Sequence, residues 1–316
     1  MWGFLERVRP TSWLALLLSI AAFELVLLSS HPIYDGPVGE FLDRIDVATD
    51  GWIGPMLVFP SLSLALMALV LFGIGELRAE DVGWRKPDLL PAFAITVLFW
   101  ASSQAVLCLE DAQAGYYASW RWSSEWRGSV LAALCGQVFG NALVEETFYR
   151  GLLLPQVFVK TIDRVGRCAA LVLATGASLA LWTVSHLPML LRSKHLGGES
   201  LCDGLVWTTC FGLILTLAFL VTRNLFLCVG LHSLWNARVT LIVAPLETRE
   251  SVWWGLTFLL LALWWRWNTR SPVTHVPGLI CYRCARSEPS IRRAGQHPRA
   301  QSRVVYFRAP LRSPRA

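Results

Sequence analysis

The stretch Trp13–Ser30, WLALLLSIAAFELVLLSS, decides the fold class, because it is long and apolar enough to cross a lipid bilayer. A membrane span needs about 20 mostly apolar residues, and Glu24 is the single ionisable residue in this run. Arg7 and Arg9 precede it, so a secretory signal peptide is the alternative. The run is long for a signal peptide and lacks a convincing small-residue cleavage site. We therefore expect a retained transmembrane helix.

The composition of the whole chain agrees with this expectation. Hydrophobic residues make up 54% of the 316 residues and charged residues 16%, against roughly 25% charged residues in soluble domains. So few charges cannot cover a water-exposed surface, which excludes an ordinary soluble enzyme. The abundant apolar surface likewise excludes a disordered chain.

Seven more apolar runs follow the first one. The eight expected spans are Trp13–Ser30, Trp52–Gly75, Leu90–Leu109, Ser129–Phe158, Cys168–Leu191, Gly204–Thr222, Leu225–Ala244 and Val252–Trp267. The fourth is too long for one straight span and contains Pro155, so we expect a span followed by a kinked or surface-lying extension. The expected fold class is all-α, a polytopic membrane helix bundle of about eight transmembrane helices.

The charge distribution predicts the orientation of the chain. From Arg266 to the end there are 11 Arg and one acidic residue, Glu288. Eight spans put both termini on one side, and that side collects 20 Lys and Arg against 6 on the other. The positive-inside rule then places both termini in the cytoplasm. We expect the tail to be disordered or bound to anionic lipid headgroups, and we expect no nucleic-acid partner.

The eight cysteines do not indicate a disulfide framework. Six lie in or beside apolar runs, where we expect small core residues. Cys281 and Cys284 form a lone CxxC flanked by His275 and His297, which leaves a weak zinc site as an alternative.

The fourth run contains residues 140–150, GNALVEETFYR, with two carboxylates and a guanidinium in apolar surroundings. Ionisable groups inside a span cost about 2.5–3.5 kcal/mol each, so each is a functional candidate. Glu146 and Arg150 are i,i+4 neighbours and can pair along one helix face. Glu145 lies about 140° around the helix from Arg150 and should point away from that pair.

Glu145 instead continues a polar stripe formed with Gln137 and Asn141 at i,i+4,i+8 spacing. We expect it to face a polar cavity, where a carboxylate can act as general base for water. The alternative is a buried ion-pair network that only fixes helix packing.

Two later runs each contain an intramembrane histidine. Trp182 lies one turn before His186 and could support its ring. His232 and Asn236 share a helix face, and both side chains can donate hydrogen bonds to a developing oxyanion. Either histidine could instead be a packing residue, and His232 could also bind a metal. With Glu145, these groups suffice for hydrolysing a peptide bond with water.

Three motifs in this order resemble those of a known family. Residues 145–150 match EExxxR, residues 182–186 match FxxxH with Trp in place of Phe, and residues 232–236 match HxxxN. The ordered set resembles the CPBP family of intramembrane proteases, which includes the CAAX prenyl protease 2 (Rce1-like) and the bacteriocin-processing (Abi) enzymes. The resemblance covers about residues 129–244.

The resemblance implies an intramembrane endopeptidase acting on a membrane-associated protein or peptide. Glu145 with His186 would activate water, and His232 with Asn236 would stabilise the oxyanion. The supporting residues would be Glu146, Arg150, Asn141 and Trp182. The resemblance leaves the cofactor open: the mechanism can be metal-free glutamate catalysis, or a divalent metal such as zinc can bind Glu145, His186 and His232.

The chain is accordingly divided into four parts. Residues 1–128 hold the first three transmembrane helices, 129–244 the CPBP-like catalytic core, 245–268 the last transmembrane helix and 269–316 the Arg-rich cytoplasmic tail. Two other functions stay open, a proton-coupled transporter and a non-catalytic membrane scaffold. A transporter predicts internal repeats with broken helices, which the sequence does not show.

One geometric difficulty follows from the span limits. They place His186 near one end of its helix and His232 nearer the opposite face, about 10 Å apart in depth. Convergence of the two histidines with Glu145 therefore requires tilted, broken or unequal helices.

Overall fold

The computed structural model describes residues 3–113, 124–192, 198–237, 239 and 246–270. Within these ranges every regular element is a helix or a helical turn, which confirms the predicted all-α class. The described elements all belong to one compact unit, Met1–Ser271. Most of the predicted tail, with Cys281 and Cys284, lies outside the described residues.

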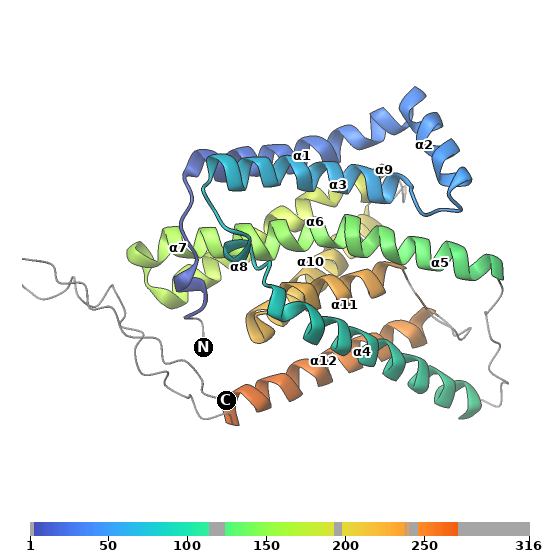
Figure 1. Cartoon of the computed structure of the whole chain (residues 1–316). Coiled ribbons are helices and arrows are strands. Elements are labelled where there is room, and N and C mark those ends of the chain that lie inside the picture. The colour runs from blue at the N-terminus through green and yellow to red at the C-terminus, as the bar shows by residue number, and fades with distance from the viewer. Residues whose placement is uncertain (1–2, 114–123, 193–197, 238, 240–245, 271–316) are drawn as a thin grey trace, which may run out of the picture. The chain divides into compact units, whose positions relative to one another are not determined.

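The elements follow one another in the order shown in Figure 1. The α-helices are α1 (Trp13–Tyr34), α2 (Pro37–Ala48), α3 (Pro55–Ala68), α4 (Lys86–Gln113), α5 (Ser124–Gly136), α6 (Ala142–Glu146), α7 (Leu154–Val165), α8 (Arg167–Ser185), α9 (Leu187–Arg192), α10 (Glu199–Thr222), α11 (Leu225–Ala237) and α12 (Leu246–Arg270). Two 3₁₀ turns, η1 (Leu5–Arg7) and η3 (Ala79–Val82), and three π-helical segments, η2 (Leu69–Ile74), η4 (Gln137–Asn141) and η5 (Thr147–Leu153), join them.

Five helical stretches in the described part of the chain are long and apolar enough to cross a membrane. They are Trp13–Ser30, Pro55–Ile74, Ala79–Glu110, Arg167–Leu191 and Ser200–Thr222. They coincide with the first, second, third, fifth and sixth predicted runs, so the multi-pass membrane character is confirmed. The seventh run forms a shorter apolar helix, α11. The count of eight spans therefore stays a prediction.

The fourth run differs in its internal geometry from the expected kinked helix. It is a continuous helical path from α5 to α7, in which the π-helical η4 and η5 flank the short α6. Pro155 lies in the first turn of α7, directly after η5, and has no N–H to continue the hydrogen bonding of this helical path. π-helical turns inside α-helices often mark functional sites, and here they bracket Glu145 and Glu146.

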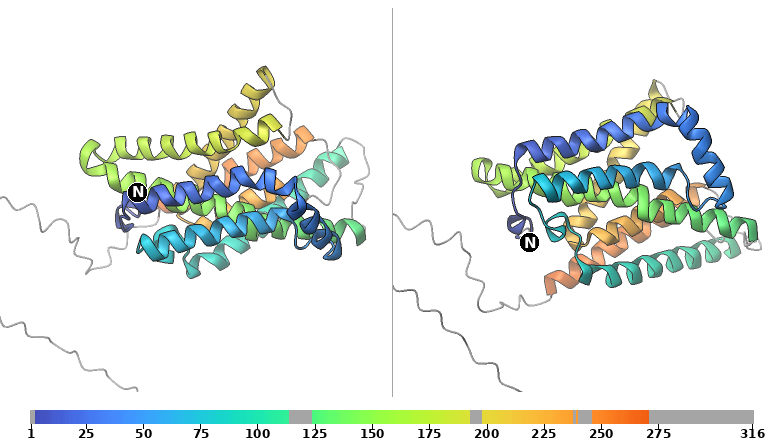
Figure 2. Two further views of the ribbon diagram at one scale, coloured as in Figure 1. Left: turned by 90° about the horizontal axis from the view of Figure 1, so that it is seen from above. Right: turned by 45° about the horizontal axis from the view of Figure 1, so that its top comes forward.

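This fourth path lies at the centre of the packed helices. Phe148, Tyr149 and Leu152 of η5 are fully buried. The α6 segment contacts α3 and α11, while η5 contacts α8 and η3. In Figures 1 and 2, α1 and α3 run side by side, α8 packs on α7, and α11 lies against α4. A Cβ at Gly140 would lie 2.5 Å from the Met56 carbonyl oxygen, so glycine permits this close approach of α3 to η4.

Candidate active site

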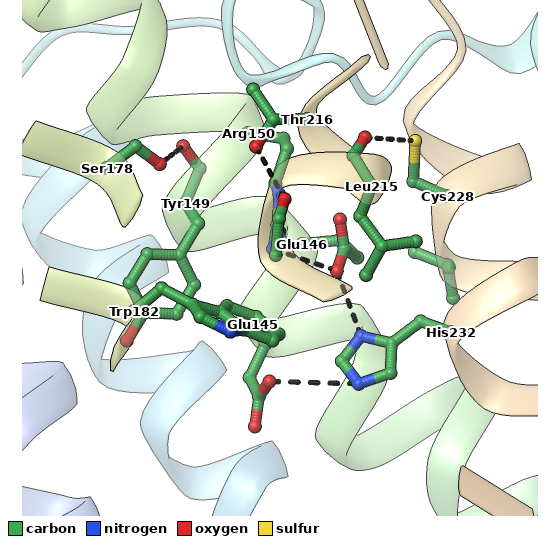
Figure 3. A network of polar contacts seen from close by, with 12 residues as sticks. Glu145, Glu146, Tyr149, Arg150, Ser178, Trp182, Leu215, Thr216, Cys228 and His232 are labelled. Atoms are coloured by element: carbon green, nitrogen blue, oxygen red, sulfur yellow. Dashed lines mark hydrogen bonds and ion pairs between the residues drawn. The ribbon is translucent and has the colours of Figure 1, made fainter. Parts of the chain in front are cut away.

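Three side chains from separate helices converge as the sequence predicts. Glu145 Oε2 lies 4.0 Å from His186 Nε2 and 3.8 Å from His232 Nε2. Glu145 comes from α6, His186 follows the last residue of α8, and His232 lies within α11. Figure 3 shows the Glu145 carboxylate beside the His232 ring, on the side away from Arg150.

The expected difference in depth between the histidines does not arise, because their helices are unequal. His186 is the C-cap of α8, directly before α9. The α11 helix has only 13 residues, about 20 Å at 1.5 Å per residue. It follows α10 after a turn at Arg223, whose φ of 59° is left-handed. A helix this short is not constrained to start at one bilayer face and end at the other.

The predicted ion pair between Glu146 and Arg150 is present and buried. Arg150 Nη1 donates to Glu146 Oε1 at 3.0 Å, and both side chains are at most 1% exposed. Arg150 Nη2 also donates to the Gly212 carbonyl at 2.8 Å. The guanidinium carbon lies 4.3 Å from the centre of the Trp182 ring, within the range of a cation–π contact.

Glu146 also contacts His232, which the sequence did not predict. His232 Nδ1 is 2.9 Å from Glu146 Oε1. An ionised carboxylate only accepts hydrogen bonds, so Nδ1 carries the proton and Nε2 faces Glu145. His186 has the same arrangement, because its Nδ1 is 2.7 Å from the Trp182 carbonyl oxygen. In both histidines Nδ1 therefore carries a proton, and Nε2 is the ring nitrogen that faces Glu145.

The Trp182 ring packs against the rings of both His186 and His232. Its ring centre is 4.6 Å from that of His186 and 5.6 Å from that of His232. Its Nε1 donates to the Thr208 carbonyl at 3.0 Å. A Cβ at Gly212 would lie 2.8 Å from the Trp182 ring, so glycine makes room for the larger indole. Trp182 thus packs against both histidine rings, and its supporting role stays a prediction.

The amide side chains meet on the neighbouring wall. Asn236 Nδ2 donates to Gln137 Oε1 at 3.1 Å, and Asn141 Nδ2 lies 3.4 Å from the same oxygen. Asn236 is exposed to the cavity that Glu145 also lines. An amide N–H is thus placed on the same cavity as the carboxylate and the two histidines.

A cavity of about 650 Å³ opens over these groups. Its walls are mainly apolar and aromatic, and include Phe23, Phe59, Trp207, Phe211 and Trp235. Ser185 also lines it, next to His186, and sequence reasoning did not single out this residue. The combination of a large apolar volume and a few converging polar groups is typical of a ligand site.

The donor atoms at the site are of the types that zinc prefers, but their spacing is wide. Zinc–ligand distances of about 2.0–2.2 Å place tetrahedral donors about 3.3–3.6 Å apart. The separations from Glu145 Oε2 are 3.8 and 4.0 Å. Among the described residues, no group of three or more His, Cys, Asp and Glu is set to hold a metal ion. In this arrangement the residues do not fit a tetrahedral zinc ion.

A buried carboxylate thus faces two imidazoles inside a multi-pass helical membrane protein. Residues 126–238 match the family described as "Type II CAAX prenyl endopeptidase Rce1-like". This segment, which holds all three motifs, is similar to that family, and the match confirms the resemblance drawn from the motifs. Searches of curated proteins and of solved structures gave no significant match.

By its description, the matched family consists of endopeptidases. The matched segment contains all the candidate site residues, namely Glu145, Glu146, Arg150, His186, His232 and Asn236.

Proposed function

We propose that the protein hydrolyses peptide bonds of a membrane-associated protein or peptide, with water activated by Glu145. The observation that carries this proposal is the convergence of Glu145 Oε2 with Nε2 of His186 and His232, at 4.0 and 3.8 Å. These distances are too long for direct hydrogen bonds. They leave space for one water molecule, which can donate to Glu145 Oε2 and His186 Nε2 and accept a hydrogen bond from protonated His232 Nε2.

The attack step uses the free oxygen of Glu145. Oε2 has no hydrogen-bond partner among the described residues, so it can accept a proton from water. As the proton moves to Glu145, the water oxygen bonds to the carbonyl carbon of the substrate. The carbonyl oxygen becomes an oxyanion. His186 Nε2 orients the water by accepting a hydrogen bond from its second O–H group, whose proton stays on the oxygen.

The oxyanion is stabilised by Asn236 and His232. The Asn236 amide donates one hydrogen bond, and His232 donates another from Nε2 when it is protonated. Glu146, at 2.9 Å from Nδ1, stabilises the positive charge of the protonated ring.

The tetrahedral intermediate then collapses. The C–N bond breaks, and the proton held by Glu145 passes to the leaving amine. The products are a free amine and a carboxylic acid, and Glu145 returns to its ionised form. No other reactant than water is consumed.

The cavity favours a substrate with a large apolar part. Its aromatic and aliphatic walls can bury a lipid group or a row of hydrophobic side chains. A CAAX-type substrate, in which a lipid is attached near a C-terminal peptide, combines both features. We further propose that both termini face the cytoplasm, as the excess of Lys and Arg on that side indicates.

The test asks whether the detergent-purified protein cleaves a farnesylated C-terminal peptide and the same peptide without the farnesyl group. The Glu145→Gln variant should insert and fold normally but lose cleavage. Glu250→Gln is a matched control, because Glu250 lines the same cavity without contacting the histidines in any described bond. Normal cleavage by Glu145→Gln would exclude the proposed base. Loss of cleavage only in Glu250→Gln would place the chemistry elsewhere.

A further inference from the structure

Glu24 is an ionisable residue in the middle of the first apolar span, outside the family-matched segment. Ionisable side chains inside spans are rare and usually functional. Glu24 is only partly exposed, on a face of α1 that turns toward the other helices. Phe23 beside it stacks on Phe148 of η5, with ring centres 4.3 Å apart and an angle of 11° between the rings. This stacking holds α1, and with it Glu24, in place against η5.

Glu24 contacts the end of the helix that carries His186. Ser185 Oγ donates to Glu24 Oε1 and also lies 2.9 Å from the Leu181 carbonyl oxygen. Ser185 is the last residue of α8, is 7% exposed, and directly precedes His186. The contact therefore ties α1 to α8 at the residue next to the site.

His186 needs such a tie because its own hydrogen bond does not fix it relative to Glu145. Its Nδ1 bonds to the Trp182 carbonyl within the same helical segment, so that bond moves with α8. Helix ends also fray more easily than helix centres. A displacement of about 1 Å at a reacting group can lower a rate by about 100-fold.

We propose that Glu24 is a positioning residue that acts through Ser185 to hold His186 Nε2 opposite Glu145. This inference rests on the proposed hydrolysis. It adds a contribution from α1, which the matched segment does not contain. The carboxylate is required as a hydrogen-bond acceptor at this place, and an amide oxygen of the same length can replace it.

The experiment compares four variants on the farnesylated peptide, namely Glu24→Leu, Glu24→Gln, Ser185→Ala and Glu24→Leu combined with Ser185→Ala. Glu24→Leu and Ser185→Ala should each lower kcat about tenfold and change KM less than threefold. The double variant should lose no more than either single variant, because both break one contact. Glu24→Gln should keep kcat within about threefold of the wild type.

Thermal unfolding separates positioning from folding. Removing a charge from a span should leave the Tm of Glu24→Leu unchanged or raise it, although kcat falls. The inference would be overturned by a wild-type kcat in Glu24→Leu. It would also be overturned if kcat of the double variant fell about 100-fold, the product of the two tenfold losses. If Glu24→Leu does not fold, Ser185→Ala decides in the same way: a wild-type kcat refutes the tie.

These outcomes are distinct from failure of the proposed function. If the wild type cleaves and Glu145→Gln does not, the hydrolysis stands whatever Glu24 does. If the wild type cleaves neither peptide, the hydrolysis itself fails.

Discussion

Replacing Arg150 by Met should destabilise the protein strongly, because it leaves the Glu146 carboxylate buried without its cationic partner. Both side chains are at most 1% exposed and their charged atoms are 3.0 Å apart. Removing one partner of a buried ion pair costs about 3–5 kcal/mol. Methionine keeps most of the apolar volume, so the lost charge dominates the effect. At 2–4 °C per kcal/mol, the Tm should fall by roughly 6–20 °C.

A second variant isolates the charge from the packing. Combining Arg150→Met with Glu146→Gln removes both ions, so no unpaired charge remains buried. We expect this double variant to be more stable than Arg150→Met by at least about 1 kcal/mol. The amide oxygen introduced by Glu146→Gln can still accept the hydrogen bond from His232 Nδ1, which Glu146 Oε1 accepts at 2.9 Å in the wild type.

The assay is thermal unfolding in detergent, followed by intrinsic fluorescence of the 16 Trp residues. Glu250→Gln is the control for removing a carboxylate that has no place in the ion cluster. If Arg150→Met unfolds at the wild-type temperature, the pair does not behave as a desolvated ion pair. The single variant Glu146→Gln is measured as well. If the fall in Tm of the double variant equals the sum of the falls in Arg150→Met and Glu146→Gln, an unpaired buried charge is not the cause of the destabilisation.

Three further predictions concern the groups around the histidines. Gly212→Ala should lower the Tm, because its Cβ would lie 2.8 Å from the Trp182 ring, and Trp182→Phe should restore part of the loss; an unchanged Tm in Gly212→Ala would contradict the close contact. Asn236→Ala should lower kcat by about 100-fold at unchanged KM and Tm, as for the loss of one oxyanion donor; a change confined to KM would instead assign Asn236 to substrate binding. A chelator should leave cleavage of the farnesylated peptide unchanged, since the Glu145–histidine separations exceed those of a zinc site; loss in chelator that zinc reverses would refute this.

Local rules were sufficient for what lies within one helix. The i,i+4 spacing predicted the Glu146–Arg150 pair, and the helical angle between Glu145 and Arg150 predicted that Glu145 points away from it. Apolar run length predicted five stretches that the structure confirms as long enough to span. These inferences succeed because each depends on neighbouring residues in one known geometry.

Contacts between distant segments could not be read in the same way. The Glu146–His232 contact joins residues 86 positions apart, and the Ser185–Glu24 contact joins residues 161 positions apart. No periodicity relates such pairs. The histidine motifs indicated which residue types meet, but only the resemblance to a family placed them at one site. The depth estimate failed because it treated the short α11 as a full span.

The π-helical turns on either side of α6 decide where the chain can change length without moving the site. Each residue of an α-helix turns the chain by about 100°, and a π turn holds one residue more than an α turn. Deleting one residue from η4 can therefore leave an unbroken α-helix in which Glu145 still faces both imidazoles. Deleting one residue of α6 ahead of Glu145 would instead rotate this carboxylate by about 100° relative to α5. Loss of a single codon there would inactivate the protein without exchanging any side chain of the site.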